Sequence, residues 1–99
     1  MSFVSTQPAA LTAAAGELTG IGSAMAAQNA AAAPATTGVV PAAADPVSAL
    51  TAAQFIAHAD LYQAVSAQAN AIHQMFVTTL MTSAGSYEAT EAANAAAAR

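Results

Sequence analysis

The sequence predicts an all-α fold, an antiparallel two-helix hairpin, and three observations support this prediction. Alanine, the best helix former, supplies 33 of the 99 residues. Large apolar residues recur at the three- to four-residue spacing of a helix, and not in the strict alternation of a strand. One proline-rich segment separates two long stretches of helix-forming residues. Two long helices joined by a short connection pack as antiparallel neighbours.

The first predicted helix covers about residues 8–33. Pro8 suits the first helical position, because its missing N–H would have no helical partner there. Leu11, Leu18 and Met25 follow at intervals of seven residues. Pro34 is expected to end or kink this helix, because a proline removes one backbone hydrogen bond and clashes with the preceding turn.

The second predicted helix covers about residues 46–84, after a connection over 34–45. Asp45 followed by Pro46 indicates its start, because a capping carboxylate precedes a proline at the first helical position. The motif "SAGS", which contains Gly85, indicates its end. The predicted organisation is therefore a helical hairpin over residues 1–84 and a C-terminal tail over residues 85–99.

The second helix carries a broader apolar surface than one neighbouring helix can cover. One stripe consists of Leu61, Val65, Ile72 and Phe76, and an adjoining stripe repeats at sevens through Phe55, Tyr62, Ala69 and Phe76. A surface helix that packs on one neighbour shows a single apolar stripe of about 100°. We therefore expect two more helices, from a partner or from self-association, to complete a four-helix bundle.

The residues expected to contact that partner are large and apolar and lie on both helices. They are Leu11, Leu18, Ile21, Met25, Leu50, Phe55, Leu61, Tyr62, Val65, Ile72, Phe76 and Leu80. Leu11, Leu18, Leu61, Val65 and Ile72 are expected to belong to the core of the hairpin as well, because a bundle has one continuous core. Met25, Met75 and Met81 are interpreted as core filler.

Composition excludes several classes of function. A net charge of −4 with one cationic side chain argues against nucleic acid and against an anionic membrane surface. The chain has no cysteine, and His58 and His73 would lie about 22 Å apart along a helix, so they cannot share one metal. Each histidine is interpreted as a partly buried packing or hydrogen-bonding residue. No catalytic constellation is visible, so neither an enzyme nor a cofactor is predicted. Prolines and polar residues also interrupt the charge-free stretches, which argues against a membrane-spanning helix.

Several phrases follow one another in a distinctive order. They are "MSFV", a proline at position 8, "PAAADPVSALTAAQF", "AIHQMFVTTL" and "GSYEATEAANAAAA". Together they resemble the mycobacterial PE family over the whole chain. Within the family, the chain looks like a short member that consists of the PE domain alone, similar to those of the fifth ESX type VII secretion system. Pro8 is followed by Ala9 where the family has Pro-Glu, which puts in doubt any contact made through that acid.

The resemblance implies a partner and a destination. PE proteins are helical hairpins that pair one-to-one with a PPE protein, as an obligate heterodimer, in one helical bundle. A cytosolic EspG chaperone binds the pair through the PPE subunit, and a type VII secretion machinery exports it folded. The expected localisation is therefore outside the cell, at the cell surface or in the outer envelope. An alternative is a structural or nutrient-permeability component of the outer envelope that acts with its PPE partner.

The resemblance also implies an export signal in the tail. The family's Tyr-x-x-x-Asp/Glu motif falls on Tyr87 and Glu91 in this chain. Residues four apart on a helix share a face, so these two side chains would be presented together. A Trp-x-Gly turn is expected beside the motif, and the partner would have to supply it because this chain has no tryptophan.

Overall fold

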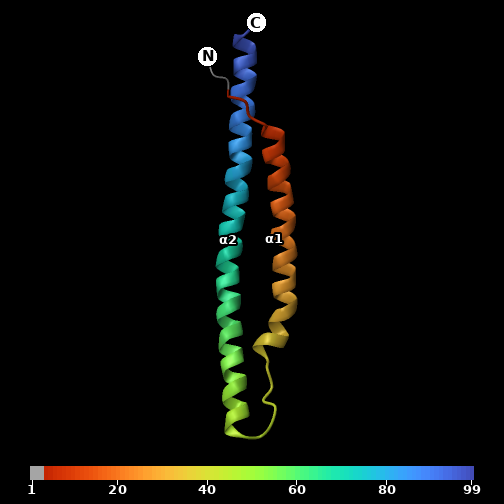
Figure 1. Ribbon diagram of the computed structural model, residues 1–99, viewed down its shortest axis with the longest axis vertical. Helices are drawn as coiled ribbons and strands as arrows, with labels where there is room; N and C mark the ends of the chain where they lie inside the picture. The colour runs from red at the N-terminus through yellow and green to blue at the C-terminus, as the bar shows by residue number, and fades with distance from the viewer. Residues whose placement is uncertain (1–3) are drawn as a thin grey trace. The chain divides into compact units, whose positions relative to one another are not determined.

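The computed structural model describes residues 4–99 and contains two α-helices in this range, with no strand (Figure 1). Helix α1 runs over Pro8–Thr37 and helix α2 over Pro46–Ala97. The predicted all-α class is confirmed. Met1, Ser2 and Phe3, which open the phrase "MSFV", lie outside the described residues.

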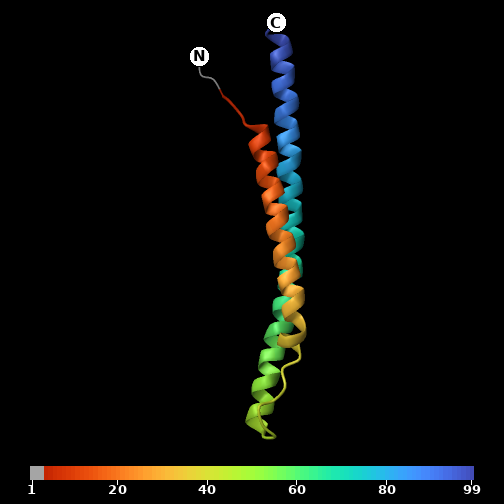
Figure 2. The ribbon, with the colours of Figure 1, turned by 90° about the vertical axis from the view of Figure 1, so that its right-hand side faces the viewer.

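The structure divides into two units, and each contains a segment of both helices. Unit 1 combines the chain up to Gly22 with His73–Arg99, and unit 2 is the continuous stretch Ser23–Ile72. Within each unit the segments of α1 and α2 lie antiparallel and side by side, as both views show (Figures 1 and 2). The predicted hairpin pairing is therefore present in each unit.

Helix α1 continues past Pro34, so the predicted end near residue 33 is wrong. The last turn gains hydrogen bonds that do not depend on backbone N–H groups. The hydroxyl of Thr36 donates to the Ala32 carbonyl at 2.9 Å, and that of Thr37 donates to the Ala33 carbonyl at 2.7 Å. These bonds supplement the backbone hydrogen bonds at the end of the helix, from which Pro34 removes one donor. The helix extends four residues beyond its predicted end.

Helix α2 begins at Pro46, where the sequence places its start. The Asp45 carboxylate accepts hydrogen bonds from the Ser48 backbone N–H at 2.9 Å and from the Ser48 hydroxyl at 2.8 Å. This is an N-cap, in which a side-chain oxygen satisfies a free donor of the first turn. The hydrogen bond from the Ser48 N–H, followed by that from the hydroxyl, lowers the pKa of Asp45 below its ordinary value of 3.8.

Helix α2 also continues beyond its predicted end at residue 84, which is wrong. Gly85 keeps a helical backbone and has no positive φ. One glycine costs a helix about 1 kcal/mol relative to alanine, and the alanines of residues 92–98 are the best helix formers. The segment predicted as a tail is thus a continuation of α2 up to Ala97.

Small side chains form the core. The buried residues among residues 4–99 are four alanines and one valine: Ala15, Ala52, Ala59, Val77 and Ala84. No polar or charged residue is buried in this range. Fifteen large hydrophobic residues of the described segment, residues 4–99, remain exposed. Fully burying a Leu, Ile or Phe side chain stabilises a fold by about 1.5–3 kcal/mol, and this core contains none of them.

The covered residues of α2 follow a regular four–three spacing, which we name the α2 seam. In unit 2 the seam consists of Ala52, Ile56, Ala59, Gln63, Ser66 and Asn70, and in unit 1 of His73, Val77, Leu80 and Ala84. This spacing is the heptad pattern that keeps one face of a helix against its neighbour. Half of the seam in unit 2 is polar, which explains why the apolar pattern of the sequence did not reveal it.

The stripe of large apolar residues predicted to share in the core lies off the α2 seam. Leu61, Val65 and Ile72 are 55–63% exposed, so their expected contribution to the hairpin core is wrong. Leu11 and Leu18 of α1 are half-buried. The physical reason is that the smaller side chains of the seam occupy the surface between the helices, which leaves the larger ones outside.

A few polar contacts join the two helices within each unit. In unit 1, His73 Nε2 lies 2.7 Å from the Leu18 carbonyl oxygen, and because a carbonyl can only accept, Nε2 carries the proton. In unit 2, the Tyr62 hydroxyl donates to Asn29 Oδ1 at 2.7 Å and the Gln63 amide donates to the Asn29 carbonyl at 3.2 Å. These bonds fix the register of α1 against α2.

The cap at Asp45 yields a prediction with a defined pH dependence. Asp45→Ala should speed hydrogen exchange of the Ser48 amide, because that N–H loses its acceptor. Because folding lowers the pKa of Asp45, the contribution of the ionised carboxylate is complete well above pH 3.8 and is lost as the pH falls through the folded-state pKa.

Asp45→Asn is the matched control for this cap. Asparagine caps about as well as aspartate and does not ionise, so its Ser48 protection should not depend on pH. Protection of Ser48 that is equal in wild type and Asp45→Ala at neutral pH would contradict the cap.

Substitution by alanine is expected to affect the stability of α1 differently at two of its glycines. A Cβ at Gly22 would lie 2.8 Å from the His73 ring, whereas a Cβ at Gly16 meets nothing within 4 Å. Gly16→Ala should therefore stabilise α1 by about 0.5–1 kcal/mol. Gly22→Ala should be at least about 1 kcal/mol less stable than Gly16→Ala, because the ring must leave the Leu18 carbonyl. Native-state hydrogen exchange of α1 amides measures both, and equal stabilisation by the two substitutions would contradict the contact.

Candidate interaction surface and tail motif

The residues predicted to contact a partner are mostly outside the core. Nine of the twelve are exposed and the other three, Leu11, Leu18 and Leu80, are half-buried. In unit 1 the exposed ones are Ile21 and Phe76. In unit 2 they are Met25, Leu50, Phe55, Leu61, Tyr62, Val65 and Ile72. We name these nine residues the outward apolar set.

Several exposed hydrophobic residues were not predicted as contacts. Met75 is 62% and Met81 54% exposed, so the interpretation of these two as core filler is wrong, as it is for Met25. Val47 at the start of α2 and Val40 in the connection are exposed too. Position relative to the α2 seam separates covered from exposed residues of α2. Neither Met75 nor Met81 falls on the four–three spacing of the seam.

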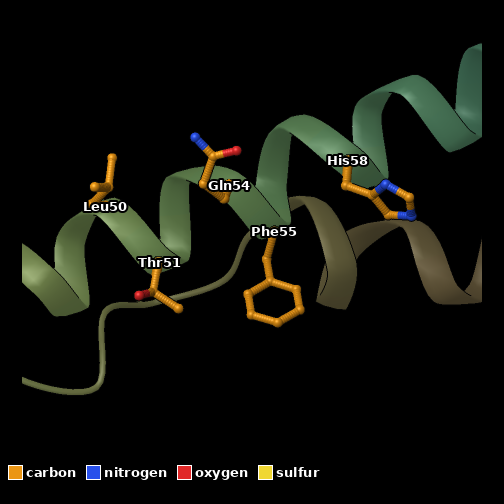
Figure 3. A pocket seen from close by; sticks show the side chains of 5 residues that line it. All are labelled: Leu50, Thr51, Gln54, Phe55 and His58. Atoms are coloured by element: carbon orange, nitrogen blue, oxygen red, sulfur yellow. The ribbon is translucent and has the colours of Figure 1, made fainter.

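A surface pocket of about 400 Å³ lies on α2 in unit 2 (Figure 3). Its lining consists of Leu50, Thr51, Gln54, Phe55 and His58. Thr51 and Phe55 project to the same side of the helix, with the Phe55 ring free of the ribbon (Figure 3). Leu50 and Phe55 are members of the outward apolar set, so the pocket is a hollow within that surface.

The two histidines have different environments. His73 is half-buried and hydrogen-bonded, as predicted. His58 is exposed and lines the pocket, so its interpretation as a partly buried residue is wrong. Within residues 4–99, no three His, Cys, Asp or Glu side chains come together as a possible metal site. In the same range, neither helix is long and apolar enough to cross a membrane.

Tyr87 and Glu91 lie on α2 within unit 1, one helical turn apart. The spacing from Ala84 to Tyr87 and on to Glu91 is three and then four residues, which continues the α2 seam beyond its last buried alanine. Tyr87 is 46% exposed and Glu91 is exposed. The two side chains therefore share the face of α2 that packs on α1 further back along the helix.

Glu91 also contacts the N-terminal segment of unit 1. The Thr6 hydroxyl donates a hydrogen bond to Glu91 Oε1 at 3.0 Å. Thr6 belongs to residues 4–7, which precede α1 without regular secondary structure (Figure 2). Nothing in the sequence indicated this contact, because the two residues are 85 positions apart.

The fold and the surface together define a two-helix protein whose core is made of small residues and whose large apolar residues face outward. The chain belongs to the PE family, whose family model matches residues 4–94. The predicted membership of the PE family is thereby confirmed.

Three relatives show how the similarity is distributed. The chain is 65% identical over 98 residues to PE family protein PE13 of Mycobacterium tuberculosis (strain ATCC 25618 / H37Rv), with 99% of both chains covered. It is 60% identical over 98 residues to PE family protein PE8 of the same strain, covering 99% of this chain and 36% of that protein. It is 58% identical over 96 residues to PE-PGRS family protein PE_PGRS33 of strain CDC 1551 / Oshkosh, covering 97% of this chain and 20% of that protein. The chain thus spans one relative almost end to end and only a part of the other two.

Proposed function

We propose that this chain is the PE subunit of a PE–PPE heterodimer that a type VII (ESX) secretion system exports. Its role is to bind the PPE protein and to present a targeting signal to the secretion machinery. The observation that carries the proposal is the inverted distribution of side chains. In the part of the chain that the structure describes, the core is four alanines and one valine, whereas fifteen large hydrophobic residues are exposed.

The outward apolar set provides the free energy for binding. Covering one such side chain contributes about 1.5–3 kcal/mol, and association itself costs about 4–15 kcal/mol. Nine side chains of this kind, about half covered already, can therefore offset the cost of association only if most of them are buried by the partner. A partner that contributes two helices satisfies this condition, because a helical pair packed on another completes a four-helix bundle.

The arrangement of the α2 seam supports a partner on the outside of the hairpin. Small and polar seam residues, such as Ala59 and Gln63, occupy the surface toward α1. Leu61 and Val65 lie on other faces of the same turns and stay exposed. The binding partner therefore meets a surface that is apolar and nearly free of charge. Membership of the PE family supports a PPE protein as the proposed partner, and an EspG chaperone is proposed to bind the pair through that PPE protein.

Tyr87 and Glu91 are the proposed targeting signal. They lie on a helix, and residues four apart on a helix present their side chains on one face. A regular helix fixes the separation of the two Cβ atoms, so one receptor can contact both side chains. Glu88 is the neighbouring acid on α2 but faces a different direction, about 100° from Tyr87 around the helix.

Phe76→Ala tests the proposed partner surface. Phe76 is 55% exposed, so its removal should cost the hairpin little and the heterodimer more. We expect the dissociation constant of the heterodimer to rise about 10- to 100-fold, which corresponds to the loss of one buried aromatic side chain. Titration of the co-purified pair, with helix content followed by circular dichroism, measures this dissociation constant.

Gln68→Ala is the control for Phe76, because Gln68 is an exposed polar residue of α2 outside the outward apolar set. The dissociation constant of the heterodimer with Gln68→Ala should stay within about twofold of the wild-type value. Equal affinities for wild type and Phe76→Ala would contradict the assignment of this surface.

The export signal is tested by substituting Tyr87 and Glu91 separately with alanine in mycobacterial cells that produce the tagged chain. In each variant the heterodimer should still form inside the cell. Its exported fraction should fall at least about tenfold, because the receptor loses one of its two contacts. Glu88→Ala is the matched control, since it removes a neighbouring acid without touching the motif, and it should be exported normally. Normal export of the Tyr87 and Glu91 variants would reject the signal.

A further inference from the structure

We propose that Thr6 is a positioning residue for the targeting signal, holding the Glu91 carboxylate in place from the N-terminal segment of unit 1. The signal would then combine both ends of the chain, Thr6 with Tyr87 and Glu91, and would not be confined to the tail. This inference rests on the proposed function of Tyr87 and Glu91.

The contact itself is a charge-assisted hydrogen bond. The Thr6 hydroxyl donates to Glu91 Oε1 at 3.0 Å, and the two residues belong to the same unit. Hydrogen bonds to an ionised carboxylate are stronger than those between neutral groups. Glu91 Oε2 accepts no hydrogen bond from the described residues, so one oxygen of the carboxylate stays open to a receptor.

Thr6 behaves differently from eight of the nine other threonines. These eight donate their hydroxyl to the carbonyl four residues earlier in their own helix: Thr12, Thr19, Thr36, Thr37, Thr51, Thr79, Thr82 and Thr90. Thr6 precedes α1 and has no such carbonyl. Its hydroxyl is therefore available to another segment, and it is directed to the acid of the motif.

The α2 seam explains why these two residues meet. Positions 84, 87 and 91 continue the seam spacing toward the C-terminal end of α2. In unit 1 that face packs on α1, but α1 begins only at Pro8. The residues that reach the next position along the seam are therefore those before the helix, and Thr6 is the one that bonds to Glu91.

The N-terminal end of α1 also favours the Glu91 carboxylate in this position. The first turn of α1 contains no acidic residue of its own. A helix N-terminus favours a nearby negative charge. The bond to Thr6, two residues before Pro8, brings the Glu91 carboxylate to this end of α1 from α2.

The consequence for recognition is preorganisation. A free glutamate side chain samples many rotamers, and a receptor that binds one of them must pay for ordering it. The Thr6 bond restricts Glu91 before the receptor arrives. Removing the bond should therefore weaken recognition by about two- to tenfold, the range that one such hydrogen bond corresponds to.

The test compares Thr6→Val with Thr6→Ser in mycobacterial cells that produce the tagged chain. Valine has nearly the shape of threonine but no hydroxyl, and serine keeps the hydroxyl. Thr6→Val should lower the exported fraction about two- to tenfold while the amount and thermal midpoint of the intracellular heterodimer stay unchanged. Thr6→Ser should restore export. Thr12→Val is the matched control, because the Thr12 hydroxyl bonds only to Pro8 of its own helix, and it should be exported normally.

Each other outcome overturns the inference. Export of Thr6→Val at the wild-type level would mean that the bond has no role, and higher export would mean that it masks the signal. Loss of the heterodimer in Thr6→Val would make Thr6 a folding residue. Tyr87→Ala and Glu91→Ala, run in parallel, separate this failure from a failure of the proposed function. If these two variants block export and Thr6→Val does not, only the proposed role of Thr6 is contradicted.

Discussion

The contact between α1 and α2 through small side chains is the constraint on which the rest of the structure depends. Alanines at positions such as Ala15, Ala59 and Ala84 are buried, and Val77 is the one larger hydrophobic residue buried with them within residues 4–99. A seam of this kind stabilises each unit weakly, because an alanine methyl removes little apolar area from water. It also leaves fifteen large hydrophobic side chains among residues 4–99 exposed on the outside of the helices.

The same seam gives the C-terminal end of α2 its geometry. Tyr87 and Glu91 occupy the next two positions of the four–three spacing, beyond the point where α1 begins. The side that is buried further back along α2 is therefore accessible at its end, and it carries a ring and a carboxylate instead of methyl groups. Thr6 reaches this position from the other end of the chain. Under the proposed function, packing and targeting would use one face of α2, and partner binding would use the other faces.

Local signals were sufficient for some features of the fold and insufficient for others. The all-α class followed from composition, and the start of α2 from Asp45 and Pro46, because a cap acts within one turn. The C-terminal ends of both helices were not predicted correctly. Threonine hydroxyls outweighed Pro34 in α1, and an alanine run outweighed Gly85 in α2. Periodicity located the large apolar stripes but could not tell whether the same chain or a partner covers them. The bond between the two chain ends left no sequence signal at all.

The most direct test of this account is the behaviour of the purified chain without a partner, at micromolar concentration, by sedimentation and by thermal unfolding. We predict self-association or a broad, non-cooperative loss of helix, and conversion to a discrete one-to-one complex with a sharp transition when a cognate PPE protein is co-produced. A monodisperse monomer that unfolds cooperatively by itself, with the same midpoint in the presence of the PPE protein, would contradict the account.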